Sequence, residues 1–541
     1  MTYFDKKNIQ LIIPMSGIGK RFMDAGYDNI KPLILVDNIP ILQHVVNLFP
    51  GIDDVIFICN NQHLIDRKIE ETLKTICPSC KIIGIDPNKK GPVYTVSKAF
   101  DFIDESKEII ISYCDYGTEW DFDKFLEVIH KWNFDGSIPC YTGFHPHMLG
   151  NDNYAFCQEN EMMLTKIKEK ESFTNNKMNE YASNGTYYFK RGSDVIKYFK
   201  LLMDMDIHVK NEYYISLVYN LLIQDGLKIN IFKINKMLQW GTPYDLESYN
   251  YWSGYFKNII QLQENINNPP NTTLILPMAG NGSRFYSNGF TIPKPLLDIN
   301  GLPMVVQAVK CLPDSNHIVF VCLNEHYNKY NLESIKSYCP NSDIVKINEV
   351  TDGQATTCEI GITRSKININ SPILISASDN GVFFDQSKYK KIIDDESIDV
   401  IVWTFRNNQT SKINPSAYSW INVDENNFAI EVSCKKFIYE NPLKTHAIIG
   451  TMFFRKAQYF LDGYYKNKCE DIKTNGEFYV DDVLTQNIKS GLKVKVFEVD
   501  YYICWGTPND YNTYLYWQEF FDKCTWHPYK KIKDITYHKS E

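Results

Sequence analysis

The sequence predicts an α/β protein built from two tandem doubly wound, Rossmann-like domains. Two observations support this: a long internal repeat, and the alternation of apolar strands with helices inside each copy of it. The chain has 541 residues, which exceeds the size at which single hydrophobic cores stop growing. At least two domains are therefore expected.

The repeat is first visible at IIPMSGIGKRF, residues 12–22, which returns as ILPMAGNGSRF at residues 275–285. Further matches follow in the same order: KPLI and KPLL, SYCDYG and SASDNG, NGTYYFKR and IGTMFFRK, NEYYIS and GEFYVD, WGTPYDL and WGTPNDY. Solenoid repeats are far shorter, so each copy should be a complete domain. We expect copy one over residues 1–262, an Asn- and Pro-rich linker over 263–272, and copy two over 273–541.

Within each copy, strands and helices take turns. An apolar strand (QLIIPM, TLILPM) runs into a glycine loop, a helix follows (ILQHVVNLF, MVVQAVKCL), and a second apolar strand comes next (DVIFICN, HIVFVCL). This alternation predicts a largely parallel sheet with ligands at the carboxyl ends of its strands. Duplicated domains often pack as homodimers do, so we expect an intramolecular pseudo-dimer and leave further homo-oligomers open.

Composition excludes several classes of protein. The formal net charge of −8 provides no basic surface for nucleic acid or an anionic membrane, so neither partner is expected. No apolar run long enough to span a membrane and no signal-peptide pattern is present, which favours a cytoplasmic protein. The fourteen cysteines are scattered, Cys77 and Cys80 form a single CxxC, and His145 and His147 lack a third ligand. We therefore expect the cysteines to be reduced, structural thiols and His145 and His147 to belong to a loop that binds no metal.

A G-x-G-x-R-F loop follows the first strand of each copy. Glycines at a strand end let backbone N–H groups point at a phosphate, and a nearby arginine can hold its oxygens bidentately. The loop is neither a Walker sequence nor a dinucleotide fingerprint. About ten residues later, Lys-Pro-Leu adds a flexible positive charge. The residues concerned are Gly17, Gly19, Arg21 and Lys31 in copy one and Gly280, Gly282, Arg284 and Lys294 in copy two.

Each copy also has an aspartate directly after an apolar strand, Asp115 in SYCDYG and Asp379 in SASDNG. A carboxylate at a strand end is a natural ligand for Mg²⁺ beside nucleotide phosphates. The alternative is an aspartate that caps the next helix.

Together, these motifs resemble the sugar-phosphate nucleotidyltransferases, also called nucleotide-diphospho-sugar pyrophosphorylases. The resemblance covers nearly the whole chain, twice. It implies Mg²⁺-dependent transfer of a nucleotidyl group from an NTP to a sugar 1-phosphate or similar phosphorylated metabolite, with release of pyrophosphate. The product would be an activated NDP-sugar-type precursor for glycan or capsule synthesis. In that family the glycine loop and its arginine wrap the triphosphate, the lysine contacts phosphate, and the strand-end aspartate binds Mg²⁺.

The resemblance also implies base-side and acceptor-side residues. Near the base, copy two has Gly353, Gln354 and Ala355, whereas copy one has Gly91-Pro92-Val93, which lacks the amide. Around the acceptor, the implied residues are Lys170, Gly185 and Glu212 in copy one and Lys435, Gly450 and Glu477 in copy two. Copy one pairs Glu169 with Lys170, while copy two has Cys434 before its lysine.

A second metal-binding aspartate of the family is not visible, because Gln239 and Cys504 occupy its place. Asp500 is a candidate substitute in copy two, where copy one has Asn235.

Two alternatives stay open. One copy, more readily copy one, could be a non-catalytic nucleotide-binding regulatory domain. The protein could instead be a nucleotide-sugar glycosyltransferase, although the Asp-x-Asp motif that such enzymes use is absent at Asp115 and Asp379.

Overall fold

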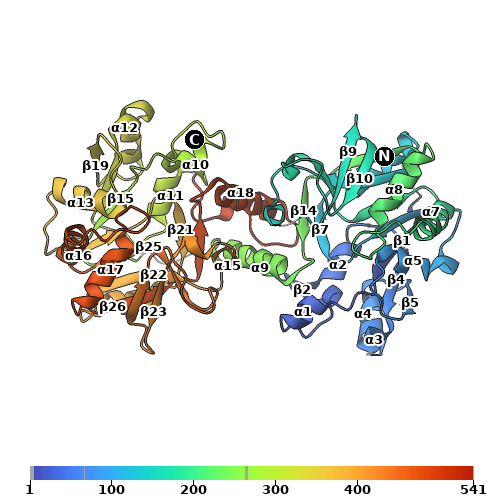
Figure 1. The fold of residues 1–541 in the computed structure, drawn as a ribbon, viewed down its shortest axis with the longest axis horizontal. Coiled ribbons are helices and arrows are strands. Elements are labelled where there is room, and N and C mark those ends of the chain that lie inside the picture. Colours follow the sequence, from blue (N-terminus) through green and yellow to red (C-terminus); the bar gives the residue numbers. More distant parts are fainter. Residues whose placement is uncertain (1–4, 66, 151, 262–265, 540–541) are drawn as a thin grey trace. The chain divides into compact units, whose positions relative to one another are not determined.

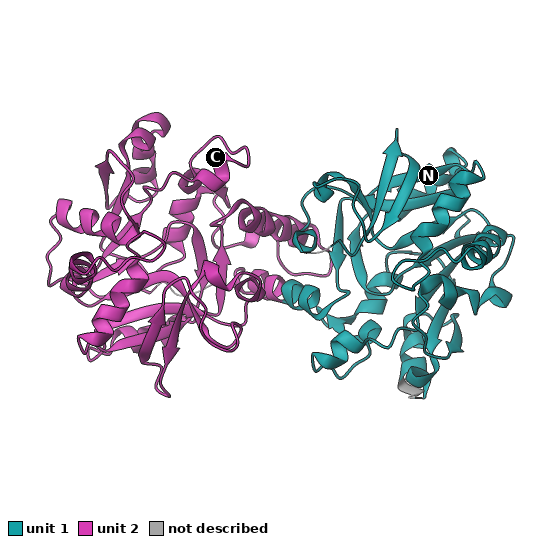
Figure 2. Ribbon diagram, viewed as in Figure 1, with its two compact units in different colours: residues 1–250 teal, residues 251–541 magenta. Residues whose placement is uncertain are grey.

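The structure is a computed structural model that describes residues 5–65, 67–150, 152–261 and 266–539 (Figure 1). The chain divides into two compact units, residues 1–250 and residues 251–541 (Figure 2). The division falls inside helix α9 (Pro243–Asn258), ahead of the linker expected from the sequence. Part of that linker lies outside the described residues, and the expected domain bounds stay a prediction.

Unit 1 is built on one mixed sheet. Its strands, in sheet order, are β11 (Tyr181–Ser183), β9 (Ala155–Asn160), β10 (Met163–Glu169), β13 (Ile229–Lys233), β8 (Gly136–Tyr141), β12 (Thr186–Phe189), β6 (Glu108–Ser112), β1 (Ile9–Met15), β4 (Asp54–Asn60) and β5 (Lys81–Ile85). Strands β6, β1, β4 and β5 run parallel to one another, whereas β12 is antiparallel to β6. The parallel strands read as continuous apolar runs because both faces of the sheet are covered.

Alternate side chains of β1 reach two different cores. Ile12 joins a cluster with helices α5, α7 and α8, while Leu11 and Ile13 join a second cluster with α2, α4 and α6. Helices therefore cover both faces of the sheet, as expected for a doubly wound arrangement. The helices of unit 1 are α1 (Lys20–Asp24), α2 (Ile41–Val46), α3 (Asn61–Leu64), α4 (Arg67–Ile76), α5 (Pro92–Ser97), α6 (Phe122–Lys131), α7 (Gly192–Asp204) and α8 (Ile215–Gln224).

Unit 2 contains a second mixed sheet. Its strands, in sheet order, are β19 (Ser342–Ile347), β18 (His317–Leu323), β15 (Thr273–Pro277), β20 (Ile373–Ile375), β25 (His446–Phe454), β22 (Val400–Phe405) and β26 (Val494–Glu498), with β23 (Ser419–Val423) and β24 (Ala429–Ser433) paired beside β25. This order corresponds strand by strand to β5, β4, β1, β6, β12, β8 and β13 of unit 1. The structure confirms a mixed α/β fold.

The sheet of unit 2 is also covered on both faces. Ile275 packs with α13, α16 and α17, while Leu274 and Leu276 pack with α11 and α14. The second half of α9 adds to this unit, where the hydroxyl of Tyr251 donates a 2.8 Å hydrogen bond to the carbonyl of Tyr502. The other helices of unit 2 are α10 (Ser283–Tyr286), α11 (Met304–Lys310), α12 (Asn324–Tyr330), α13 (Gln354–Arg364), α14 (Gln386–Ile393), α15 (Gln409–Ile413), α16 (Ala457–Cys469), α17 (Val480–Lys489) and α18 (Pro508–Lys523).

Short two-stranded pairs join distant parts of the chain beside each main sheet. Strand β7 (Tyr116–Glu119) pairs with β14 (Lys236–Gln239) in unit 1, and β21 (Asn380–Phe383) pairs with β27 (Tyr501–Cys504) in unit 2. Each pair connects the segment after a strand-end aspartate to the segment before a Trp-Gly-Thr-Pro sequence. Smaller hairpins follow each Lys-Pro-Leu turn: β2 (Leu35–Val36) with β3 (Ile39–Pro40), and β16 (Asp298–Ile299) with β17 (Leu302–Pro303). Along the described parts of the chain, every helix is too short or too polar to cross a membrane.

Candidate active site

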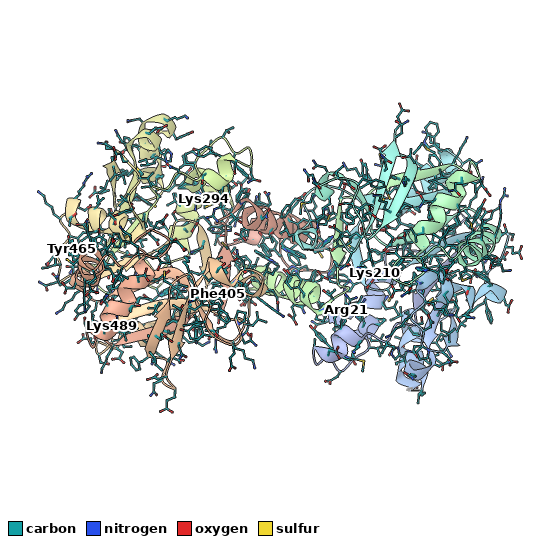
Figure 3. All side chains as sticks on the ribbon, viewed as in Figure 1. Arg21, Lys210, Lys294, Phe405, Tyr465 and Lys489 are labelled. Carbon is teal, nitrogen blue, oxygen red and sulfur yellow. The ribbon has the colours of Figure 1, made fainter. Side chains whose placement is uncertain are left out.

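In unit 1 the glycine loop lies against the Lys-Pro-Leu turn. Gly19 has a φ of 73°, in the left-handed region that favours glycine. A Cβ on Gly19 would lie 3.8 Å from the Cβ of Lys31, which begins a short 3₁₀ helix. Arg21, labelled in Figure 3, follows on α1 and is exposed. No described atom lies within 4 Å of a Cβ built on Gly17, so the loop is open on that side.

Lys31 and Asp115 form an ion pair in unit 1. The ammonium of Lys31 donates to Oδ2 of Asp115, and the two side chains are 17% and 24% exposed. The backbone carbonyl of Asp115 accepts a 3.1 Å hydrogen bond from the N–H of Trp240. That bond brings the Trp-Gly-Thr-Pro segment beside the strand-end carboxylate. A Cβ on Gly241 would lie only 3.1 Å from Oδ2 of Asp115.

The structure reveals a second carboxylate, Asp245, that the sequence analysis missed. Its N–H donates to Oγ1 of Thr242, and that hydroxyl donates back to Oδ2 at 2.5 Å. The pKa of Asp245 is raised to about 6. Burial is the main cause and the charge of Asp115 adds to it, while the hydroxyl of Thr242 and the charge of Arg21 act in the opposite direction. The signal was present in the sequence, because both copies continue Trp-Gly-Thr-Pro with an aspartate two residues later.

Unit 2 repeats the lysine–aspartate pair. Gly282 has a φ of 61°, and a Cβ there would lie 3.9 Å from Lys294. The ammonium of Lys294, labelled in Figure 3, donates a 2.6 Å hydrogen bond to Oδ2 of Asp379. Burial alone would raise the pKa of Asp379, but the charges of Lys294, Arg284 and Lys435 lower it below its ordinary value. A Cβ on Gly280 would have no described atom within 4 Å, so this glycine loop is open on that side as at Gly17.

Asp510, and not Asp500, is the second carboxylate near Asp379. Its carboxylate accepts a 2.6 Å hydrogen bond from Thr507, its pKa is raised mainly by burial, and the charge of Asp379 raises it further. Burial raises the pKa of Asp500, and the charged groups that act on it are Lys388, Asp385 and Glu498 instead of Asp379.

The acceptor side of unit 1 is a connected polar cluster. Lys170, which has a φ of 59°, donates to the hydroxyl of Tyr214, and that hydroxyl donates to Glu212. Beside them, Ser216 on α8 donates a 2.6 Å hydrogen bond to Glu169. Burial raises the pKa of Glu169 to about 7, although Ser216 and Lys170 lower it. The structure thus brings Lys170 and Glu212 together, with 3.8 Å between the ammonium and the carboxylate, while their role toward an acceptor stays a prediction.

In unit 2 the acceptor-side carboxylate has changed its position in the sequence. Cys434 replaces the glutamate, but Asp481 on α17 stands where unit 1 has Ser216 in the aligned NEYYIS and GEFYVD segments. Oδ2 of Asp481 accepts a 2.6 Å hydrogen bond from Ser419, whose hydroxyl oxygen in turn accepts the backbone N–H of Lys435 at 3.3 Å. Burial raises the pKa of Asp481, and the charge of Lys435 lowers it. The exchange is not visible from single aligned positions, because the carboxylate moves from the residue before the lysine to a helix far away in the sequence.

Glu477 and Gly450 take equivalent places in unit 2. Lys435 has a φ of 52° and Gly450 a φ of 88°, close to the values of 59° and 95° at Lys170 and Gly185. The ring of Tyr479 lies 5.4 Å from the ammonium of Lys435. The pKa of Tyr479 is raised to about 12, chiefly by burial and further by the charge of Glu477.

The base-side loop of each unit is bonded to the backbone that follows the acceptor-side glutamate. In unit 1, the N–H of Val93 donates to the carbonyl of Tyr213, and the N–H of Tyr213 donates to the carbonyl of Lys90. A Cβ on Gly91 would lie 2.7 Å from the backbone of Tyr213, so only glycine fits there.

In unit 2 the same arrangement involves Phe478. The N–H of Ala355 donates to the carbonyl of Phe478, and a Cβ on Gly353 would lie 2.4 Å from the backbone of Phe478. The N–H of Ala355 is therefore used by the fold. The side chain of Gln354, at the first position of α13, is partly exposed.

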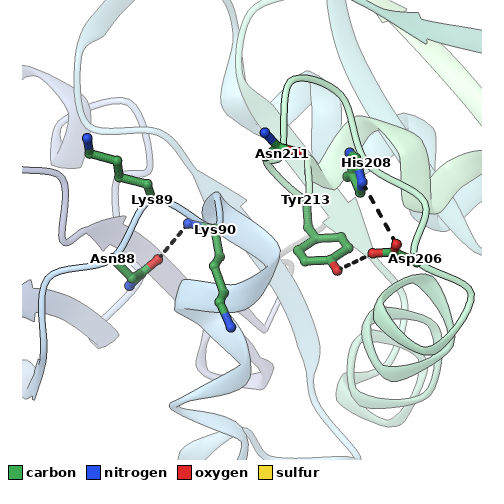
Figure 4. A pocket seen from close by; sticks show the side chains of 7 residues that line it. All are labelled: Asn88, Lys89, Lys90, Asp206, His208, Asn211 and Tyr213. Carbon is green, nitrogen blue, oxygen red and sulfur yellow. Dashed lines mark hydrogen bonds and ion pairs between the residues drawn. The ribbon is translucent and has the colours of Figure 1, made fainter.

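A pocket of about 640 Å³ borders the base-side loop of unit 1 (Figure 4). Its walls are formed by Asn88, Lys89, Lys90, Asp206, His208, Asn211 and Tyr213. Tyr213 donates a 2.6 Å hydrogen bond to Asp206 on one wall, and Asn88 accepts the N–H of Lys90 on the other. In unit 2, Asp352 stands directly before the loop glycine Gly353, where unit 1 has Lys90 before Gly91. The rims of the two base-side loops therefore differ in charge.

The donor set fits a magnesium ion. Each unit places two aspartates near one another, Asp115 with Asp245 and Asp379 with Asp510, and the charge of the first raises the pKa of the second. Mg²⁺ binds through one or two carboxylates together with substrate phosphates, and a cation would relieve this repulsion. Larger clusters of three or more His, Cys, Asp or Glu side chains suited to a metal are absent from the described residues.

The histidine pair and the cysteines have other surroundings. Nε2 of His145 lies 3.3 Å from the N–H of Met237, and burial lowers the pKa of His145 to about 4. His147 is hydrogen-bonded to the hydroxyl of Tyr141 at 3.0 Å. All the cysteines are free thiols, including Cys77 and Cys80.

A sheet whose strand ends carry a glycine loop and a paired lysine and aspartate is typical of the class of α/β proteins that bind nucleotides. Residues 11–242 match the family model described as nucleotidyl transferase, and this match supports a nucleotidyltransferase activity. That match covers unit 1 alone. No curated protein matches the sequence.

Solved structures similar to this chain include three bacterial proteins. A nucleoside-diphosphate-sugar pyrophosphorylase from Vibrio cholerae is 22% identical over 44% of this chain and 99% of its own, with a TM-score of 0.38. A putative glucose-1-phosphate thymidylyltransferase from Bacillus anthracis is 17% identical over 45% and 93%, with a TM-score of 0.35. The inositol-1-phosphate CTP transferase from T. maritima is 16% identical over 47% and 98%, with a TM-score of 0.36.

Proposed function

We propose that the protein transfers a nucleotidyl group from an NTP to a sugar 1-phosphate or a similar phosphorylated metabolite, with Mg²⁺, and releases pyrophosphate. The observation that carries the proposal is the lysine–aspartate pair beside the glycine loop, present in both units as Lys31 with Asp115 and Lys294 with Asp379. The product would be an NDP-sugar-type precursor for glycan or capsule synthesis.

The reaction is an in-line displacement at the α-phosphorus. An oxygen of the acceptor phosphate forms the new P–O bond while the bond to pyrophosphate breaks. This oxygen is already ionised at neutral pH, so no general base is needed, and catalysis depends on positioning and charge neutralisation. Mg²⁺, when bound at Asp115 with Asp245 or at Asp379 with Asp510, would supply positive charge to the phosphates.

The chain's own residues provide the remaining positive charge. Arg21 and Lys31 in unit 1 flank the open glycine loop, and the triphosphate gives Lys31 an anionic partner in place of Asp115. Lys170, held by the hydroxyl of Tyr214, is placed to bind the acceptor phosphate. Lys435 has that role in unit 2.

A second candidate for unit 1 is a regulatory domain that binds a nucleotide without turnover. Pro92 follows Gly91 where unit 2 has Gln354, so the base meets neither the side-chain amide nor a backbone N–H at that position. Two features oppose the regulatory candidate: the pair of Lys31 with Asp115 is intact, and Lys170 is held by Tyr214. Both favour a second activity with a different base or acceptor.

The test is a pyrophosphate-release screen of the common NTPs against a panel of sugar phosphates. It compares the wild-type chain with Arg21→Ala/Lys31→Ala and with Arg284→Ala/Lys294→Ala, which disable one unit each. We expect different NTP and acceptor pairs to be lost in the two variants. No pyrophosphate release with any pair would contradict the proposal, and loss in only the second variant would favour the regulatory candidate.

A further inference from the structure

The ring of Tyr113 covers the acceptor-side glycine of unit 1. A Cβ on Gly185 would lie 3.0 Å from Cδ2 of Tyr113 and 3.5 Å from its Cβ. The backbone N–H of Tyr113 also donates a 3.0 Å hydrogen bond to the carbonyl of Gly185. The aromatic ring therefore occupies the space that faces this glycine.

The hydroxyl of Tyr113 is buried among acceptor-side groups. Within the described residues it has no hydrogen-bond partner. Burial raises the pKa of Tyr113 well above its ordinary value, and the charges of Glu169, Tyr214 and Asp115 are among those that add to the effect. Burying a hydroxyl without a partner is unfavourable, and a ligand that bonds to it recovers this cost.

Unit 2 has a methyl group at this position. Ala377 stands two residues before Asp379, as Tyr113 stands two residues before Asp115. A Cβ on Gly450 would lie 3.6 Å from the Cβ of Ala377, and no other described atom comes within 4 Å of it. The face of Gly450 is therefore open where the face of Gly185 is covered.

We infer that Tyr113 and Ala377 determine which acceptor each unit takes, an inference that rests on the proposed function. Tyr113 restricts unit 1 to a compact phosphorylated polyol or sugar and bonds to one of its hydroxyl groups. Ala377 leaves room in unit 2 for a bulkier sugar phosphate, such as one with a substituted ring. Pocket shape of this kind discriminates by tenfold or more, and a site built to bond a hydroxyl rejects analogues without it more strongly.

The experiment measures both turnover and equilibrium binding in full-length protein. Unit 1 is isolated by Arg284→Ala/Lys294→Ala, and the acceptors are glycerol 3-phosphate, ribitol 5-phosphate, glucose 1-phosphate and N-acetylglucosamine 1-phosphate. Tyr113→Ala should shift preference toward the larger acceptors by roughly tenfold or more. Tyr113→Phe keeps the ring, so it should preserve the ranking while weakening the preferred acceptor roughly three- to tenfold. Ala377→Tyr, with unit 1 disabled, should shift unit 2 toward the smaller acceptors.

The outcomes separate this inference from the proposed function. The same acceptor ranking in wild type and Tyr113→Ala, by binding and by turnover, would overturn the inference. If the acceptor ranking shifts as much in Tyr113→Phe as in Tyr113→Ala, the size of the ring does not select the acceptor. A shifted binding ranking without pyrophosphate release would overturn the proposed function and support the inference, whereas no binding of any acceptor would overturn both.

Discussion

The ammonium of Lys294 lies 2.6 Å from Oδ2 of Asp379, and both side chains are about one fifth to one quarter exposed, at 21% and 24%. Each group stabilises the charge of the other in a partly buried position. Although burial acts in the opposite direction, the charges of Lys294, Arg284 and Lys435 lower the pKa of Asp379, so the aspartate that should bind metal is kept ionised before substrate arrives.

We therefore expect Asp379→Asn and Lys294→Ala to reduce turnover by unit 2 about 10²-fold or more, because each removes charge that must be matched in the transition state. Turnover is measured with unit 1 disabled. The control is Lys390→Ala, which removes an exposed ion pair with Asp394 and should change the rate less than twofold. Unchanged turnover in both site variants would contradict a catalytic role for the pair.

Glu169 should make the stability of unit 1 depend on pH. Its pKa rises from 4.5 to about 7 in the folded protein, so the native state binds a proton more tightly than the unfolded state. Stability from this group is fully present below pH 4.5 and falls as the pH rises to about 7, by on the order of 3 kcal/mol. Urea unfolding at pH 5 and pH 7.5 measures this.

In Glu169→Gln the charge is absent at both pH values, while the contact with Ser216 can remain. The variant should therefore gain stability relative to wild type between pH 5 and pH 7.5. If the free energies of unfolding of the two proteins differ by the same amount at pH 5 and at pH 7.5, Glu169 does not titrate in this range.

Asp481 should act as a positioning residue for Lys435 in unit 2. It holds Ser419, which accepts the backbone N–H of Lys435. Asp481→Asn should raise the KM for the acceptor by roughly tenfold with little change in kcat, since hydrogen bonds to charged groups are worth about 1.5–3 kcal/mol. Cys434→Glu/Asp481→Ser rebuilds the arrangement of unit 1 and should recover most of the loss. A fall in kcat alone would contradict the positioning role.

Gly506 should tolerate no side chain, because a Cβ there would lie 3.1 Å from Oδ2 of Asp379 and 3.3 Å from Sγ of Cys504. Gly506→Ala should displace the carboxylate and reduce turnover by unit 2 about tenfold or more, since small misplacements are costly in catalysis. Gly150→Ala is the control, because no described atom lies within 4 Å of its Cβ. Circular dichroism checks that both variants fold. Full activity in Gly506→Ala would contradict the expected crowding.

Much of the fold could be predicted from the sequence because its signals are local. Apolar runs such as Asp54–Asn60 and the glycine loops before Arg21 and Arg284 depend on neighbouring residues alone. The lysines of Lys-Pro-Leu and the strand-end aspartates are each identified as site residues from sequence motifs, whereas their contact with one another is visible only in the structure.

The remaining site features depend on contacts between distant segments. Asp481 supplies a carboxylate for a loop far away in sequence, so comparing Cys434 with Glu169 suggested only a loss. Asp245 was hidden because its visible partner is local, the hydroxyl of Thr242 three residues earlier. Tyr113 follows an ordinary apolar strand, and only the packing of its ring on Gly185 relates it to the acceptor.

The paired backbone hydrogen bonds between the Gly353 loop and Phe478 make the base side and the acceptor side one cooperative element. A nucleotide that orders this loop also orders the segment that carries Glu477. The entropy cost of ordering that segment then falls on nucleotide binding and is not repeated when the acceptor binds. The second substrate should then bind more tightly to the nucleotide-loaded protein than to the empty one. Because such coupling is reciprocal, the acceptor must raise the affinity for the nucleotide by the same factor.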